Sequence, residues 1–310
     1  MRELVSVIMS TYNEEIEWIK KSIDSILLQT YQHFEFIIVI DNPYNDRIKK
    51  MIFDYEERDN RIKVILNEEN IGLVKSLNKA LDLCQGKYVA RMDADDISSY
   101  ERLMKEKEYL EKNSLDFVFS GAIMIDENDN ELNDMGNVEL QYKEVKKEME
   151  RGNISPHPTW FLKREVYKHL GGYREIPYCE DYDLSLRALI NGYKIGKINE
   201  NLIKYRVRTN SITRTYSFEQ FLITRKILSL YNSGKLDDNY YVYKSINELI
   251  DQMNSFEKAK FIDAKNQYQH GTKFLEEGKY FKGYLTKVKS CMISKYYFQV
   301  ILNSLKNKVR

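Results

Sequence analysis

The chain has 310 residues, 43% of them hydrophobic, and carries 48 Lys and Arg against 47 Asp and Glu, a formal net charge of +1. This composition indicates a folded protein with a substantial core and excludes intrinsic disorder. The near-zero net charge provides no global field for nucleic acid, so we expect no nucleic-acid partner. The longest apolar run, residues 36–40, falls far short of the roughly 20 residues that cross a bilayer.

The N-terminal segment lacks the long apolar region and the small-residue cleavage site of a signal peptide. We therefore expect the protein in the cytoplasm. The three cysteines, Cys84, Cys179 and Cys291, are widely spaced, which predicts reduced thiols and neither a disulfide framework nor a metal-binding Cys pair.

Strands and helices alternate in the first two thirds of the sequence. Apolar composition predicts buried strands at residues 4–9, 34–40, 62–66, 88–92 and 117–125. Apolar residues at three- and four-residue spacing predict helices that begin near Ile16 and Leu73. This order predicts an α/β fold, Rossmann-like, with a mostly parallel central sheet and flanking helices. Beyond residue 215 the periodicity is helical throughout, so we expect one domain at residues 1–215 and a C-terminal helical region at 216–310.

The end of the chain combines basic and aromatic residues. From Lys279 to Arg310 there are eight basic residues and no acidic one, among aromatic and aliphatic side chains such as Phe281, Tyr284 and Tyr297. This pattern is typical of a peripheral contact with an anionic membrane surface. The alternative is a solvated basic helix that packs on the rest of the protein.

The most informative segment is an acidic cluster at the end of a predicted strand. The strand at 88–92 leads into Asp93-Ala94-Asp95-Asp96, and ligands of open α/β sheets gather at the carboxyl ends of strands. Three adjacent carboxylates repel one another unless a cation is present. Mn²⁺ or Mg²⁺ held by carboxylates and substrate phosphates would remove that repulsion. The alternative is a solvated turn or a helix N-cap.

A second acidic group lies far along the chain. Glu180-Asp181-Tyr182-Asp183 precedes leucines at helical spacing, and one of these carboxylates could act as a general base. Metal-binding carboxylates in one place and an uncommitted carboxylate in another suit a displacement at a centre that carries a diphosphate leaving group.

Taken together, these segments resemble the inverting glycosyltransferases of family 2, which have the GT-A fold. The resemblance covers about residues 4–210. The matching segments, in order, are Val5 to Glu14, Gln29 to Tyr31 ahead of Phe36 to Asp41, Asn70 to Gly72, Ala90 to Asp96, Gly171 to Tyr173 and Glu180 to Leu184.

The resemblance implies a role for particular residues. The nucleotide-sugar site would include Thr11, Tyr12, Glu14, Asp41, Asn70, Gly72, Arg91, Asp93, Ala94, His157 and Arg208. Asp95, with Asp93, would hold the Mn²⁺ or Mg²⁺ ion that bridges the diphosphate, and Asp181 would take the proton of the acceptor hydroxyl. Attack opposite the departing diphosphate would invert the anomeric carbon and give a β-linked product from an α-linked donor.

Several of these residues have alternative, structural interpretations. Asn70 and Gly72 could cap the following helix, Arg91 could brace Asp93, and His157 lies between two prolines in a loop.

The sequence also departs from the family pattern in two places. Asp41 begins Asp-Asn-Pro-Tyr where many relatives have Asp-Asp-Gly-Ser, and Tyr205-Arg-Val-Arg208 replaces a tyrosine-arginine-x-histidine pattern. Because Arg cannot ligate a cation, Arg208 or Arg206 would instead neutralise diphosphate charge or form surface ion pairs.

We therefore expect an enzyme that moves a sugar from a nucleotide donor, UDP-hexose or UDP-N-acetylhexosamine, to a hydroxyl of a glycan or lipid-linked oligosaccharide. The expected setting is a bacterial surface polysaccharide such as a capsule or O-antigen, at the inner face of the cell membrane. A haloacid-type phosphatase is disfavoured because Ile97 follows the second aspartate by two residues, and no G-x-G-x-x-G supports a dinucleotide enzyme. The non-enzymatic alternative is a catalytically silent sugar-nucleotide-binding subunit of an assembly complex.

Overall fold

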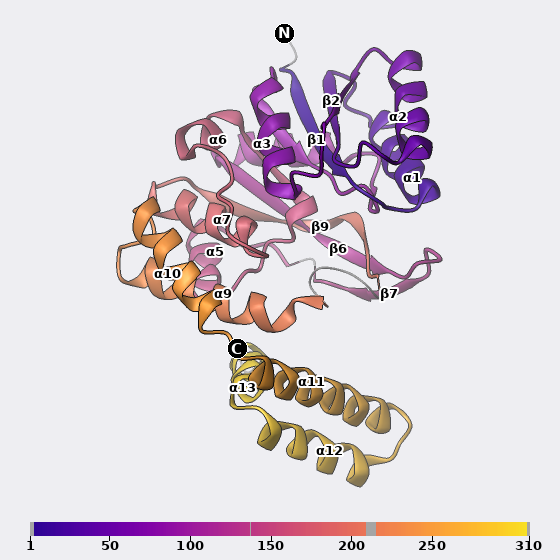
Figure 1. Cartoon of the computed structure of the whole chain (residues 1–310). Helices are drawn as coiled ribbons and strands as arrows, with labels where there is room; N and C mark the ends of the chain where they lie inside the picture. Colours follow the sequence, from indigo (N-terminus) through magenta and orange to yellow (C-terminus); the bar gives the residue numbers. More distant parts are fainter. Residues whose placement is uncertain (1–2, 137, 209–214, 309–310) are drawn as a thin grey trace.

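The computed structural model describes residues 3–136, 138–208 and 215–308. An α/β part comprises most of the chain, and a group of helices follows it (Figure 1). The strands are β1 Val5–Thr11, β2 Phe34–Ile40, β3 Ile62–Leu66, β4 Tyr88–Arg91, β5 Ile97–Ser98, β6 Phe117–Ile125, β7 Glu131–Asp134, β8 Trp160–Lys163 and β9 Ile195–Arg206. The helices of the α/β part are α1 Ile16–Leu27, α2 Asp46–Arg58, α3 Leu73–Leu83, α4 Arg102–Lys112, α5 Tyr142–Met149, the 3-10 turn η1 His157–Thr159, α6 Arg164–Leu170 and α7 Glu180–Ile190.

The strands form one sheet in the order β3-β2-β1-β4-β8-β6-β9-β5, with β7 added beside β6. The pairs among β3, β2, β1 and β4 are parallel, as is β6 with β9. Strand β8 runs antiparallel to both β4 and β6. The expected α/β architecture is confirmed. The sheet itself is mixed, because β5, β7 and β8 introduce antiparallel pairs.

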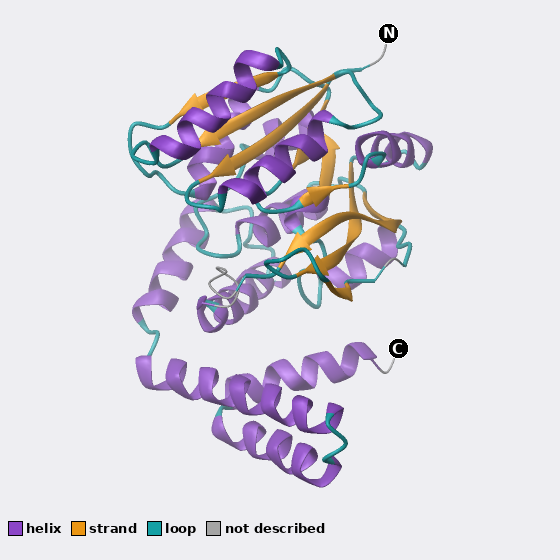
Figure 2. Cartoon of the chain, turned by 90° about the vertical axis from the view of Figure 1, so that its right-hand side faces the viewer, coloured by secondary structure: helices purple, strands orange, loops and turns teal. Residues whose placement is uncertain are grey.

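Side chains that alternate along the strands supply two cores, one on each face of the sheet. In β1, Ile8 points into the core beneath α3, α5, α6 and α7, whereas Val7 and Met9 point into the core beneath α1, α2 and α4. Figure 2 shows the helices on both sides of the strands. The buried strand β2, which reads FEFIIVI, contributes to both cores.

The described residues beyond 215 are helical, as the periodicity predicts. They form α9 Ser217–Asn232, α10 Asn239–Asp251, α11 Ser255–Glu276, α12 Tyr280–Ile293 and α13 Lys295–Lys308. Helices α9 and α10 extend the first core through residues such as Ile223 and Ile246. Helices α11 and α13 share a separate apolar cluster with Phe218 of α9. The division of the chain at residues 215 and 216 stays a prediction.

Within the described residues, no helix combines the length and the apolar character needed to cross a membrane.

Candidate active site

The carboxyl ends of three neighbouring parallel strands bring the first predicted site residues to one edge of the sheet. Thr11 ends β1, Asp41 follows β2, and Asp93 lies two residues beyond β4. Strands β2, β1 and β4 are adjacent and parallel, so their ends meet at the same edge, where open α/β sheets bind ligands.

Glu14 holds the turn after β1. Its Oε2 atom accepts a hydrogen bond from Thr11 Oγ1 at 2.7 Å and another from the backbone N–H of Tyr12 at 2.8 Å. Thr11 is buried, whereas the Tyr12 ring is exposed. Tyr12 is therefore the member of this group whose ring is available to a ligand at the surface.

Asp41 organises the loop that leads into α3. Its buried carboxylate accepts hydrogen bonds from Asn67 Nδ2 at 2.8 Å and from the backbone N–H groups of Ile71 and Gly72, each at 2.9 Å. Gly72 has a φ of +85°, a left-handed conformation that favours glycine, and is the N-cap of α3. Asn70 Oδ1 also accepts from the Gly72 N–H at 3.0 Å. Gly72 thus matches the capping alternative, whereas Asn70 holds the N–H of the cap residue and makes no side-chain cap of its own.

Replacing Asp41 by Ala should destabilise the fold and disorder this loop. The substitution removes the acceptor of three hydrogen bonds, and we expect the free energy of unfolding to fall by about 3 kcal/mol, since a buried donor without an acceptor costs about 1–3 kcal/mol. Urea unfolding measures the change. The control is Asp46→Ala, which removes an exposed ion pair with Lys49 and should have little effect. Equal losses in both variants would contradict this role of Asp41.

Arg91 is buried at the end of β4, and its guanidinium forms an ion pair with Asp93 and a hydrogen bond to the Met92 carbonyl. This geometry corresponds to the bracing alternative, because Arg91 fixes the half-exposed carboxylate of Asp93. Ala94 is buried directly after it. Ser22 Oγ of α1 donates to the Asp93 carbonyl at 2.8 Å and holds the backbone of the turn.

The end of β9 closes the other side of the acidic turn. Arg208 Nε lies 2.8 Å from Asp95 Oδ2, so Arg208 pairs with a predicted metal ligand. Arg206 is buried; its Nε donates to the Asp95 carbonyl at 2.8 Å, and its backbone N–H donates to Asp96 Oδ1 at 2.8 Å. Asp96 is therefore a buried structural residue that ties the turn to β9.

The carboxylates of Asp93 and Asp95 fit a hard divalent cation. Burial, together with the negative charge of Asp93, raises the pKa of Asp95 from 3.8 to about 6. A bound cation would relieve this repulsion. Among the residues that the structure describes, no cluster of three or more His, Cys, Asp or Glu side chains forms a ready cation site. Protein carboxylates and substrate phosphates would therefore share the ion, as is usual for Mg²⁺.

The second acidic group begins α7, and its three carboxylates have different environments. Asp183 is buried in ion pairs with Arg187 at 2.8 Å and Arg174 at 3.3 Å. Arg187 in turn donates to the carbonyls of Leu170 and Gly172. Asp183 thus fixes the Gly-Gly turn after α6 and is structural, which leaves Glu180 and Asp181 as candidate bases.

Asp181 is half-buried and available to a ligand. Its Oδ2 accepts from Asn153 Nδ2 at 2.8 Å. Burial raises the pKa of Asp181 from 3.8 to about 6; the hydrogen bonds from Tyr182 N–H and Asn153 lower it, and the charge of Asp93 raises it. The pKa of Glu180 rises to about 8, through burial and then through Asp181, and the Asp93 charge contributes there as well.

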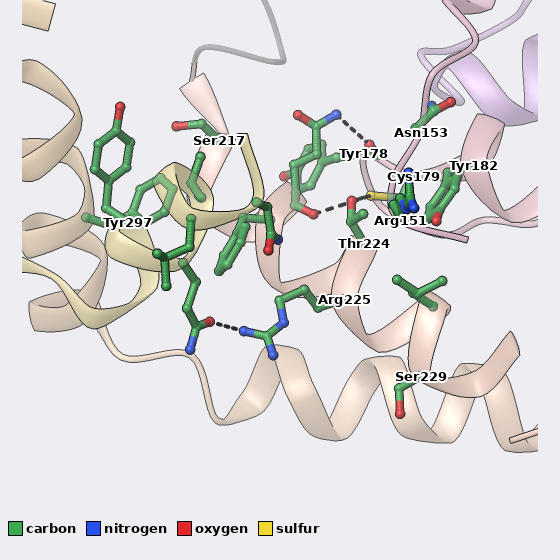
Figure 3. Close-up of a pocket in the computed structure, with 18 of the residues that line it drawn as sticks. Arg151, Asn153, Tyr178, Cys179, Tyr182, Ser217, Thr224, Arg225, Ser229 and Tyr297 are labelled. Atoms are coloured by element: carbon green, nitrogen blue, oxygen red, sulfur yellow. Dashed lines mark hydrogen bonds between the residues drawn. The ribbon is translucent and has the colours of Figure 1, made fainter. Parts of the chain in front are cut away.

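A cavity of about 1790 Å³ opens beside Asp181, between the α/β part and the C-terminal helices. Asn153, Cys179 and Tyr182 line one side and Tyr297 of α13 the other, with Thr224 and Arg225 of α9 between them (Figure 3). Asp93 and Asp95 are not among the lining residues. Asp181 lines the cavity, and the negative charge of Asp93, which lies outside it, contributes to the raised pKa of Asp181.

The backbone before Asp181 is strained and is held by α9. Tyr178 has a φ of +62°, and a non-glycine residue in this region costs about 1–3 kcal/mol. Gln220 Nε2 donates to the Tyr178 carbonyl at 3.0 Å, and the Tyr178 ring stacks on Tyr216 with centroids 4.4 Å apart. Helix α9 thus fixes the turn that presents Asp181.

His157 lies in η1, near Arg91. Its Nε2 is 2.8 Å from the Tyr173 hydroxyl, and its ring packs edge-on against Trp160 with centroids 4.7 Å apart. Burial and the charge of Arg91 keep the pKa of His157 well below its ordinary value, so the ring is neutral. This environment favours a structural role, in which His157 positions Tyr173.

No pattern in the sequence marks Asn153, Tyr178 or the α9 residues of the cavity. They come from separate segments and approach Asp181 only through the fold: Asn153 precedes Asp181 by 28 residues, and Gln220 follows Tyr178 by 42. The assigned roles of all the predicted site residues stay predictions.

The fold and this arrangement correspond to a known family. The model of glycosyl transferase family 2 matches residues 6–171, and the chain belongs to that family. The family resemblance and the GT-A type of α/β fold are thereby confirmed.

Relatives and solved structures agree with this assignment. The chain is 41% identical to an uncharacterized glycosyltransferase of Methanocaldococcus jannaschii, over 69% of this chain and 74% of that protein. It is 34% identical to the O-antigen biosynthesis glycosyltransferase WbnJ of Escherichia coli, over 73% of this chain and 91% of that protein. The structure of S. aureus TarS in complex with UDP-GlcNAc superposes with a TM-score of 0.58 at 20% identity, over 73% of this chain and 66% of that chain.

Proposed function

We propose that this protein transfers a sugar from a UDP-linked donor, a hexose or N-acetylhexosamine, to a hydroxyl of a glycan or lipid-linked oligosaccharide, with inversion at the anomeric carbon. One observation supports the proposal: the negative charge of Asp93 raises the pKa of Asp95 and contributes, less than burial, to the raised pKa of Asp181, so the candidate cation ligands and the candidate base are within electrostatic reach of one another. The UDP-GlcNAc complex of TarS, which has the same fold, supports the choice of donor.

On the donor side, the residues at the sheet edge would bind the nucleotide. The exposed Tyr12 ring and the loop that Asp41 holds would contact the base and ribose. Asp93 and Asp95 would hold Mn²⁺ or Mg²⁺, which when bound stabilises negative charge on the departing diphosphate. Arg208, already paired with Asp95, would place a further positive charge beside the phosphates.

On the acceptor side, Asp181 would take the proton. As the acceptor oxygen attacks the anomeric carbon, its O–H bond breaks, the proton moves to the Asp181 carboxylate, and the electron pair of the anomeric C–O bond leaves with the UDP. Asn153 orients the carboxylate through its 2.8 Å hydrogen bond. A positioned carboxylate of this kind accelerates such a step roughly 10²–10⁴-fold.

The cavity beside Asp181 would admit the acceptor. Its aromatic lining residues, such as Phe221 and Tyr297, suit the apolar faces of sugar rings, and Arg225 adds a hydrogen-bond donor. We propose that the acceptor belongs to a bacterial surface polysaccharide, such as an O-antigen or a capsule, and that transfer takes place in the cytoplasm. The O-antigen role in the name of the relative WbnJ supports this setting.

The turnover of sugar transfer should rise with pH, with a midpoint at about 6 or below, and level off above it. Asp181 acts in its ionised form, and its pKa is raised to about 6, so acid removes the base. A cation at Asp93 would lower this midpoint, because the Asp93 charge is one cause of the shift. A kcat profile at saturating donor and Mn²⁺ measures it. A rise of kcat with a midpoint near pH 8 would instead assign the base to Glu180.

A further inference from the structure

Helix α12 exposes large apolar side chains to solvent. Phe281 is 83% exposed and Met292 75%, values normal for charged surface residues. The exposed apolar residues of this helix are Tyr280, Phe281, Tyr284, Leu285, Val288 and Met292. At 3.6 residues per turn they fall within a sector of about 140°, so they form one face. We call these six residues the α12 face.

The opposite side of α12 is already packed. Gly283 and Ser290 are buried there, and α12 approaches α11 so closely that a Cβ at Gly283 would lie 2.9 Å from the Gly271 carbonyl oxygen. Both views place α12 on the far side of α11 from the sheet (Figures 1 and 2). The α12 face therefore points away from the candidate active site.

Lysines border the α12 face. Helical positions place Lys282 and Lys289 along one edge and Lys287 along the other. The ammonium of Lys282 lies 4.1 Å from the ring centroid of Phe274, and that of Lys287 lies 4.4 Å from the ring centroid of Tyr268. No acidic residue occurs from 279 to the C-terminus. Apolar side chains between cationic borders are the pattern of a helix that lies in the headgroup region of an anionic bilayer.

The structure divides the basic and aromatic segment of the sequence into two roles. Tyr297 and Ile301 of α13 are buried in the cluster around Phe261, and Tyr296 packs against it. These side chains hold the helices together and do not contribute to an exposed apolar face. Phe298 and Leu302 of α13 are also exposed, but the larger group of exposed apolar side chains in the segment lies on α12.

We infer that the α12 face docks on an anionic lipid bilayer. A second copy of the chain is a poorer occupant, because a symmetric contact would bring the lysine borders of two identical faces together. Anionic headgroups neutralise those borders, and the acyl boundary removes the apolar side chains from water. The inference goes beyond the proposed function and does not depend on it, since docking requires no sugar transfer.

Vesicle flotation tests the inference. The full chain should float with vesicles of phosphatidylcholine and phosphatidylglycerol mixed equally, and much less with phosphatidylcholine alone. In the double variant Phe281→Ser/Met292→Ser the partition coefficient should fall about a hundredfold, since each buried apolar side chain contributes about tenfold. In Lys282→Gln/Lys289→Gln, binding to the mixed vesicles should fall about fivefold per lysine.

Matched controls separate docking from folding and from chemistry. Tyr240→Ser removes a ring that is 76% exposed on α10 and should leave flotation unchanged. The Phe281→Ser/Met292→Ser variant should keep the wild-type melting temperature and the wild-type UDP release without vesicles. Equal binding to both vesicle types, or binding unaffected by the α12 substitutions, would overturn the inference. So would sedimentation of the wild type as a dimer that the same substitutions dissociate.

Discussion

Replacing Asp181 by Asn should lower the turnover of sugar transfer about 10²–10⁴-fold and leave the KM for the donor almost unchanged. The amide preserves the size of the side chain but cannot accept the acceptor proton. Donor binding should persist because the nucleotide would bind at the sheet edge, near Asp93 and Asp95, and would not contact the Asp181 side chain. UDP release at saturating Mn²⁺, followed as a function of donor concentration, measures both quantities.

Glu180→Gln is the matched control for this substitution. Burial and Asp181 raise the pKa of Glu180 to about 8, so its side chain is mostly neutral at pH 7 and Gln closely resembles it. We expect this variant to keep most of the activity. If Glu180→Gln loses as much turnover as Asp181→Asn, or if Asp181→Asn changes only KM, Asp181 is not the base.

Replacing Asp95 by Asn should abolish the stabilisation that Mn²⁺ and UDP together give to the protein, and should lower turnover about 10²–10³-fold, the range found when one group that stabilises transition-state charge is removed. The neutral amide is a weaker ligand for a hard cation. The melting temperature with Mn²⁺, with UDP and with both together measures the loss of coupled binding.

The unliganded protein should not lose stability in the same variant. Burial and Asp93 raise the pKa of Asp95 to about 6, so its ionised form is unfavourable in the folded state at neutral pH. Asp95→Asn removes that cost together with the pairing to Arg208. The exposed Asp82 provides a control, because Asp82→Asn should change neither stability nor ligand binding. If Mn²⁺ and UDP together raise the melting temperature of Asp95→Asn as much as that of the wild type, Asp95 does not hold the cation.

Most strands with continuous apolar runs were predictable from the sequence. The short strand β8, which reads WFLK, and the strands with mixed composition were not predicted. Strands β2, β3 and β6 match their expected bounds residue for residue. The two-residue β5 and the fully exposed β7 have no apolar run that could mark them. Strand β9 carries Lys, Asn and Glu among its apolar residues. These strands form through pairing with β6 and β9, which local sequence does not encode.

The candidate site shows a similar limit. The acidic clusters could be located because their residues are adjacent in sequence. The burial and the hydrogen-bond partners of each carboxylate could not be predicted. Asp183 and Asp96 look equivalent to their neighbours in sequence, yet both are buried: Asp183 pairs with Arg174 from outside its helix, and Asp96 accepts from the backbone N–H of Arg206. The pairing of Arg208 with Asp95 joins residues 113 positions apart. Only the fold distinguishes a carboxylate that faces a ligand from one that supports the structure.

The most direct test of the account is whether the cation site and Asp181 act in the same reaction. The measurement is UDP release from a UDP-sugar by the wild type with Mn²⁺, by the wild type after chelation, and by Asp181→Asn. The account predicts release by the first and a loss of about a hundredfold or more in each of the others. It would be contradicted by release that neither chelation nor the substitution changes, or by binding of UDP-sugars with no release at all, as expected of a silent binding subunit.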